Sequence, residues 1–177
     1  MITRWQWSRI SVLSVLFALA SASGVLAQLQ FRPATDTETR AAYCMMSTKA
    51  TIDVAQALLP TGDALANVNK LSRDNPIVQS YNQLVDFNNA LISRFNRYRT
   101  YVMLTLTRNV EPIEMFLAEK RGKEDSERWN QLYREAGCWS LNGSVADNCS
   151  KAVSEKLEVQ ELSQRMAVCN NPSWLPF

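Results

Sequence analysis

The stretch from Asn75 to Asn109 constrains the fold more than any other part of this sequence. Asn75 suits a helix N-cap, and Pro76 follows at the first helical position, where its missing N–H costs nothing. Side chains suited to a packed seam then recur every three or four residues, at Ile77, Tyr81, Leu84, Asn88, Leu91, Phe95, Tyr98 and Val102. A helix of about 33 residues is nearly 50 Å long. The pattern therefore predicts one long helix, packed against others, that Pro112 ends or kinks.

Other segments have the composition and period of shorter helices. Glycine is scarce, and the remainder is rich in good helix formers. The predicted segments are 36–59, capped by Thr35 or Asp36; 63–71; 112–136, divided at Gly122; and 149–168, with Val153, Leu157, Leu162 and Met166 facing inward. Prolines should keep the tail after Cys169 extended. The sequence thus predicts an all-α fold, an antiparallel bundle of four to five helices with one long central helix, stapled by disulfides.

The first 27 residues have the layout of a secretory signal peptide. Arg4 and Arg9 precede the apolar run Ile10–Ala20, and small residues lead to a predicted cleavage site after Ala27. The alternative is a retained anchor, because the uncharged stretch Ile10–Ala27 reaches the lower limit of a bilayer-spanning length. Cleavage would leave residues 28–177 as one exported domain, periplasmic or extracellular, with no transmembrane span.

The charge balance of this exported domain excludes one class of partner. The chain has 19 basic and 17 acidic residues, and the predicted signal peptide carries two of the basic ones, so the domain is formally neutral. Proteins that bind nucleic acids attract phosphate with net or clustered positive charge. We therefore expect no nucleic-acid partner.

All four cysteines lie outside the predicted signal peptide, which favours disulfides in an oxidising compartment. A continuous helix from Cys149 to Cys169 would hold the two residues roughly 30 Å apart, too far for a disulfide. Of the two remaining arrangements, Cys138–Cys149 with Cys44–Cys169 is the more economical, and Cys44–Cys149 with Cys138–Cys169 is the alternative. The long spacings and the absence of histidine argue against a redox or zinc site.

Few residues suggest catalysis. Without histidine, the usual triads and the commonest general base are missing, and no glycine-rich phosphate loop occurs. Two carboxylate pairs, Glu111 with Glu114 and Glu158 with Glu161, lie one helical turn apart, a spacing compatible with a glycosidase or with solvated surface charge. We expect no catalytic residue, no metal ligand and no cofactor.

A basic cluster near the end of the long helix is the main candidate for binding. Arg94, Arg97, Tyr101 and Arg108 are predicted to share one flank, while Arg99 lies on the other side of the core stripe. The flank would dock an anionic envelope polymer, a lipid headgroup or an acidic protein surface, with Tyr101 available for stacking. Alternatively, these arginines pair with Glu111, Glu114 and Glu119, which follow soon after.

The apolar tail around Trp174 is expected either to fold back over the bundle or to present a short peptide to a partner. Asn142 and Asn148 match the glycosylation pattern, which matters only in a eukaryotic source. The sequence as a whole favours an exported, non-catalytic binding or accessory protein. A carboxylate-dependent hydrolase of the cell envelope and a structural or assembly component of an envelope complex are the alternatives.

Overall fold

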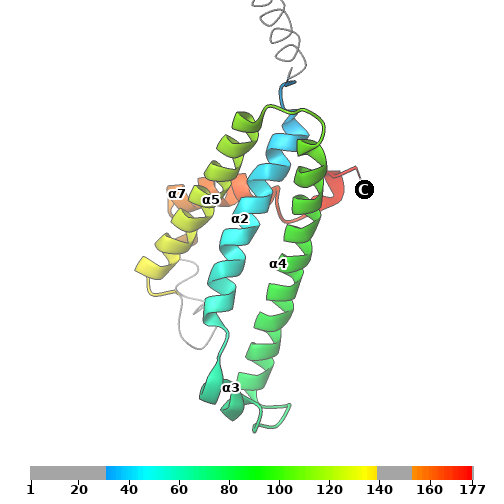
Figure 1. Ribbon diagram of the computed structural model, residues 1–177. Helices are drawn as coiled ribbons and strands as arrows, with labels where there is room; N and C mark the ends of the chain where they lie inside the picture. Colours follow the sequence, from blue (N-terminus) through cyan, green and yellow to red (C-terminus); the bar gives the residue numbers. More distant parts are fainter. Residues whose placement is uncertain (1–30, 139–152, 177) are drawn as a thin grey trace, which may run out of the picture.

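The computed structural model describes residues 31–138 and 153–176, and in this part of the chain the fold is helical (Figure 1). The elements, in chain order, are α2 (Asp36–Leu58), α3 (Gly62–Val68), α4 (Pro76–Leu106), α5 (Pro112–Glu135), α7 (Leu157–Ala167) and the short 3-10 helix η1 (Pro172–Trp174). The predicted fold class is confirmed. One long helix, α4, packs with others in a disulfide-linked bundle.

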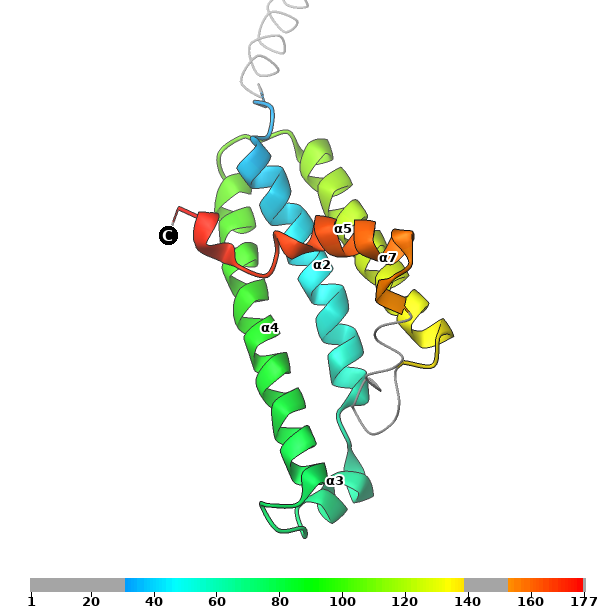
Figure 2. The same cartoon turned by 180° about the vertical axis from the view of Figure 1, so that it is seen from behind.

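Three helices form the body of the bundle, with α2 between α4 and α5 (Figure 1). Successive long helices run in opposite directions, so α2 and α5 are parallel neighbours. Helix α7 crosses α5 and α2 on the side that faces away from the viewer in Figure 1, and it lies in front of them in Figure 2. The middle position of α2 explains its composition, because small residues such as Ala41, Ala42 and Ala50 are buried on several of its sides. Small side chains allow helices to approach closely on both flanks.

Helix α2 begins with a capping box, close to where Thr35 or Asp36 was expected. Thr35 Oγ1 accepts a hydrogen bond from the Glu38 N–H, and the Glu38 carboxylate accepts one from the Thr35 N–H at 2.8 Å. Just before it, Arg32 forms a bridge to Val110 in the loop between α4 and α5. The start of α2 is thereby fixed at the end of the bundle where α4 ends and α5 begins.

The predicted seam of α4 is largely correct. Asn75 caps the helix through its side-chain oxygen, and Asn88, Leu91, Tyr98 and Val102 are buried. Ile77 is the exception, with an exposed fraction of 58%. The neighbouring α3 contributes no buried residue, so the first turn of α4 extends beyond the packed part of the bundle.

The predicted interruption at Gly122 is wrong, because α5 is continuous from Pro112 to Glu135. Gly122 is fully packed against α2. A Cβ atom at this position would lie 2.1 Å from the carbonyl oxygen of Tyr43. The glycine therefore permits close contact between two helices and does not break one.

The last helix is shorter than expected. Residues 149–152 of the predicted segment lie outside the described residues, and within the described part α7 begins only at Leu157, after Lys156 in an extended conformation. Because this break changes the helical phase, Val159 and Leu162 face the core, whereas Leu157 is 70% exposed. Val153 is buried as predicted, and Met166 is partly buried.

A disulfide joins Cys44 in α2 to Cys169 after α7, with their Cα atoms 5.1 Å apart, as predicted. The second predicted pair includes Cys149, which lies outside the described residues; none of the cysteines that are described is a free thiol. The tail folds back and is not wholly extended, since Pro172–Trp174 form a 3-10 turn. Leu175 is buried, and the rings of Trp174 and Tyr98 stack with centroids 5.7 Å apart.

The predicted signal peptide and the two glycosylation motifs lie outside the described residues. Among residues 31–138 and 153–176, no helix combines the length and apolar character needed to cross a bilayer.

Candidate functional site

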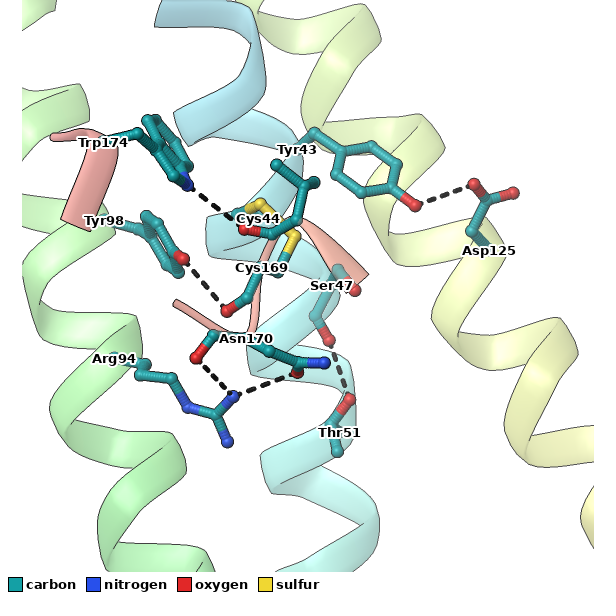
Figure 3. Close-up of a disulfide and its surroundings, with 11 residues drawn as sticks. Tyr43, Cys44, Ser47, Thr51, Arg94, Tyr98, Asp125, Cys169, Asn170 and Trp174 are labelled. Atoms are coloured by element: carbon teal, nitrogen blue, oxygen red, sulfur yellow. Dashed lines mark hydrogen bonds between the residues drawn. A yellow bond between two sulfur atoms is a disulfide. The ribbon is translucent and has the colours of Figure 1, made fainter. Parts of the chain in front are cut away.

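The residues of the predicted arginine flank differ in how far they are exposed. Arg94 is half-buried, and its guanidinium donates hydrogen bonds to the backbone oxygen and the side-chain oxygen of Asn170, at 3.4 and 3.2 Å (Figure 3). Tyr101 is only 9% exposed and belongs to the core, so its expected place on an exposed flank was wrong. The seam is wide here, since α4 also buries Tyr98, Val102 and Thr105. Arg97 and Arg108 are exposed, so only these two of the four predicted residues lie fully on the surface.

Two acids expected as possible partners of these arginines have other hydrogen bonds. The Glu111 carboxylate caps α5 by accepting from the Ile113 N–H, and the Glu114 carboxylate accepts from the Ala34 N–H. Glu119 is partly buried, and burial raises its pKa above the ordinary value. In the other carboxylate pair, Glu158 accepts two hydrogen bonds from Arg128, at 2.7 and 3.1 Å. In the described part of the chain, no group of three histidine, cysteine or acidic residues is arranged to hold a metal ion.

The disulfide lies at the centre of a polar network that ties the C-terminal segment to the bundle (Figure 3). The Tyr98 hydroxyl donates to the carbonyl oxygen of Cys169 at 3.0 Å, and the Trp174 indole donates to the carbonyl oxygen of Val168 at 3.1 Å. Arg94 extends the network to Asn170, one residue beyond the disulfide. Arg94 therefore helps to position the tail.

A second network links α2, α5 and α7 through Asp125. Its carboxylate accepts a hydrogen bond from the Tyr43 hydroxyl at 2.9 Å and a bidentate pair from Arg165 at 2.9 and 3.1 Å. Although burial opposes it, hydrogen bonding from Arg165 and Tyr43 lowers the pKa of Asp125. Burial and the bond to Asp125 raise the pKa of Tyr43. The network stabilises a carboxylate beside a protonated phenol and joins three helices.

A small cavity of about 210 Å³ lies beneath the C-terminal segment. Three hydroxyl groups of α2 line it, from Ser47, Thr48 and Thr51, together with Arg94 and Trp129. The Thr51 and Ser126 hydroxyls lie 3.1 Å apart in a hydrogen bond between α2 and α5. The cavity has room for a small polar molecule, and its lining contains no carboxylate or histidine.

A larger open groove, of about 730 Å³, lies between the N-terminal halves of α2 and α5. We call it the α2–α5 groove. One wall comes from Asp36, Thr39, Arg40 and Tyr43 and the other from Leu117, Ala118, Lys120, Arg121 and Glu124. Both sets recur every three or four residues, so each groups on one side of its helix. The parallel packing of the two helices then brings these sides together.

Two guanidinium groups line this groove and form no direct ion pair among the described residues, although Arg121 is close enough to Asp125 to help lower the pKa of that carboxyl group. Arg40 lies over the Trp174 ring, with its guanidinium carbon 5.4 Å from the ring centroid, and Arg121 forms no ion pair in this part of the chain. Lys120 approaches Glu124 at 3.8 Å in an exposed pair, a type that contributes little. The floor and walls also include Leu117, Ala118 and the half-buried Tyr43. The α2–α5 groove thus combines apolar surface with cationic groups able to bind an anion.

Sequence reasoning missed this site because its two walls are some 80 residues apart in the chain. The dense arginine run pointed to α4, whereas Arg40 and Arg121 each stand among acids in mixed-charge segments. The one available signal was Gly122, next to Arg121. A glycine within a helical pattern often marks close packing.

Comparison with known proteins gives no functional assignment. No family model matches the chain, and no curated protein and no solved structure shows significant similarity to it. The function must therefore be inferred from the residues of the site.

Proposed function

We propose that this chain is a non-catalytic helical binding protein, exported to the periplasm or the extracellular space, that holds a short acidic segment of a partner protein in the α2–α5 groove. The observation that carries the proposal is the presence of Arg40 and Arg121 on opposite walls, neither of them in a direct ion pair with a carboxylate among the described residues. A planar guanidinium binds a carboxylate through two parallel hydrogen bonds. Two such groups across a groove favour a ligand with two acidic side chains.

The charges around the groove limit the kind of ligand. Asp36 and Glu124 belong to the same lining as the three basic residues, so the site has only a small excess of positive charge. A highly charged polymer would meet repulsion from both acids. A segment that alternates acidic and apolar residues fits better, because Leu117, Ala118 and Tyr43 offer apolar contact between the charged groups.

Two features support export. The sequence before residue 28 has the layout of a signal peptide. The Cys44–Cys169 disulfide is typical of proteins that fold in an oxidising compartment.

Charge reversal tests the site. A labelled peptide of alternating glutamate and leucine serves as the probe, and its fluorescence anisotropy measures binding. We expect Arg40→Glu combined with Arg121→Glu to weaken binding at least tenfold, which corresponds to about 1.4 kcal/mol. Arg99→Glu combined with Arg108→Glu, at two exposed arginines outside the groove, makes the same change in net charge and should bind as the parent does.

Trp174 provides a second readout within the same experiment. A ligand carboxylate that draws Arg40 away from the Trp174 ring should change the fluorescence of that tryptophan and leave Trp129 unaffected. Equal losses of affinity in the groove variant and in the double variant of Arg99 and Arg108 would show that only overall charge matters. The absence of saturable binding to the parent would refute the acidic-segment proposal.

A further inference from the structure

Exposed apolar side chains gather at one end of the bundle. Six of them surround the junction of α4 and α5: Phe31, Met103, Leu104, Leu106, Ile113 and Phe116. Their exposed fractions lie between 43% and 60%. We call this set the apolar tip. In Figure 1 it lies at the upper end, where the loop from α4 to α5 passes the start of α2.

The shape of the apolar tip differs from that of a groove for a helix or peptide. Met103, Leu104 and Leu106 spread over about 160° of the outer circumference of α4, at 100° per residue. They occupy its last turn, and Ile113 and Phe116 occupy the first turns of α5. At 1.5 Å per residue, each set is only about 5 Å deep along its helix. The apolar side chains thus form a broad, shallow layer across the ends of the helices. A layer of this shape is suited to contact with a flat apolar surface.

The chain enters the bundle at the same end. The Arg32 N–H donates to the Asn109 carbonyl oxygen at 2.8 Å, and the Glu111 N–H donates to the Arg32 carbonyl oxygen at 2.9 Å. These bonds fix Phe31 beside the loop between α4 and α5. The uncharged stretch 10–27, 18 residues in the sequence, ends four residues earlier. Four residues span at most about 14 Å, so a bilayer that holds this stretch lies close to the apolar tip.

We propose that the apolar tip rests in the interfacial layer of a phospholipid bilayer that holds residues 10–27. The proposal concerns the chain while these residues are attached, before the predicted cleavage after Ala27 or in its absence, and it does not depend on the α2–α5 groove. The layer of headgroups and upper acyl chains accepts apolar side chains to a depth of about 5–10 Å. The long stems of Arg99 and Arg108 allow their charged ends to reach the headgroups.

The charges near the apolar tip predict how the docking responds to salt. Arg32, Arg99 and Arg108 are offset by acids at the same end, namely Asp36, Glu38, Glu111 and Glu114. Little net attraction to anionic lipid is therefore expected. Burial of apolar side chains should therefore dominate the docking. Docking should persist in 1 M salt, where charges more than about 3 Å apart are screened from each other. Binding in the α2–α5 groove should weaken under the same conditions.

Two single tryptophan variants of the full chain test the proposal. Ile113→Trp places the probe in the apolar tip, and Ile77→Trp places it at the other end of the bundle; the parent isoleucines are 60% and 58% exposed. Each variant is reconstituted in phosphatidylcholine vesicles, with or without bromine on the acyl chains, and the signal of the parent chain is subtracted. We expect the added tryptophan at position 113 to emit at shorter wavelength and to be quenched by brominated lipid. The tryptophan at position 77 should show neither effect.

Other outcomes would overturn the proposal. Equal quenching at positions 113 and 77 would mean nonspecific adsorption. An unshifted, unquenched tryptophan at position 113 would mean that the apolar tip stays in water. A shift to shorter wavelength without quenching, together with cross-linked dimers, would show that a second copy of the chain covers the tip. Loss of quenching in 1 M salt would show that electrostatic attraction, and not insertion of apolar side chains, holds the tip at the bilayer.

Discussion

Glu38 shows how much one side chain contributes to this fold. It is only 3% exposed, it completes the capping box of α2, and its carboxylate accepts hydrogen bonds from the Arg32 guanidinium. The hydrogen bond from Arg32 has the largest effect on the pKa of Glu38. Together with the Thr35 contacts it outweighs desolvation and lowers this pKa from 4.5 to about 2. Arg32 also bridges to Val110. This carboxylate therefore stabilises both the start of α2 and its attachment to the α4–α5 loop.

The lowered pKa predicts a pH dependence of stability. Since the folded state binds the proton more weakly than the unfolded state, the contribution of Glu38 is complete above about pH 4.5. It is lost as the pH falls from 4.5 towards 2. A pKa lowered from 4.5 to about 2 corresponds to about 3 kcal/mol. Glu38→Gln should lower the free energy of unfolding by this amount at pH 7 and flatten its dependence below pH 4.5, as measured by urea denaturation.

Asp53→Asn is the matched control for this prediction. Asp53 pairs with Lys49 on the surface of the same helix, and both side chains are largely exposed. Removal of an exposed pair of this type costs at most about 1 kcal/mol. If both variants changed stability equally across the pH range, the special role of Glu38 would be refuted.

At the scale of elements, the contact between α2 and α5 depends on Gly122. The Cβ of an alanine there would lie 2.1 Å from the Tyr43 carbonyl oxygen, so the two helices would have to separate. On an exposed helix, glycine to alanine stabilises by about 1 kcal/mol. Here we expect Gly122→Ala to lower the free energy of unfolding by about 1–3 kcal/mol, the usual cost of overpacking.

Chemical denaturation measures this effect, with Lys123→Ala as the control on an exposed position of the same helix. A surface substitution of this kind should remain within about 0.5 kcal/mol of the parent. A Gly122→Ala variant as stable as the parent would mean that the helix contact tolerates expansion.

These elements also show what sequence reasoning can and cannot predict. The seam of α4 and the cap at Asn75 followed from spacing and local chemistry, because both depend on residues close in the chain. Gly122 was predicted to break the helix, because the contact that requires a glycine there is with the backbone of Tyr43, which is remote in sequence. The break before Leu157 was missed for a related reason, since helical composition continues through it. Tyr101 was placed on the wrong side because the width of the buried stripe depends on how many neighbours cover α4.

The disulfide was predicted correctly although one premise was wrong. The long continuous helix that seemed to exclude Cys149–Cys169 is interrupted before Leu157. The prediction of Cys44–Cys169 rested equally on tying the end of the chain back to the first helix, and the structure has this arrangement. The α2–α5 groove was not predictable in the same way, because it depends on which nonconsecutive helices become neighbours.

At the scale of the whole molecule, the Cys44–Cys169 disulfide joins the first described helix to the tail across 125 positions in the sequence. In the chain-entropy model, closing a loop of this length stabilises the folded state by about 4–5 kcal/mol. We therefore expect Cys44→Ala combined with Cys169→Ala to lower the free energy of unfolding by about this amount. The residues after Cys169 should also lose protection in hydrogen exchange, because stacking of Trp174 on Tyr98 would have to hold the tail alone.

Trp174→Ala separates the covalent link from the packing of the tail. This variant keeps the disulfide but loses the stacking on Tyr98, the indole bond to Val168 and the contact with Arg40. Because the cross-link still restricts the unfolded chain, its loss of stability should be smaller than that of the double cysteine variant, and exchange near Cys169 should stay slow. Equal losses in the two variants would mean that the tail is held by its aromatic contact, with the disulfide adding little. If the aromatic contact holds the tail in this way, it also holds Arg40, which lies over the Trp174 ring. Trp174→Ala would then weaken peptide binding in the α2–α5 groove as strongly as substitution of Arg40 itself.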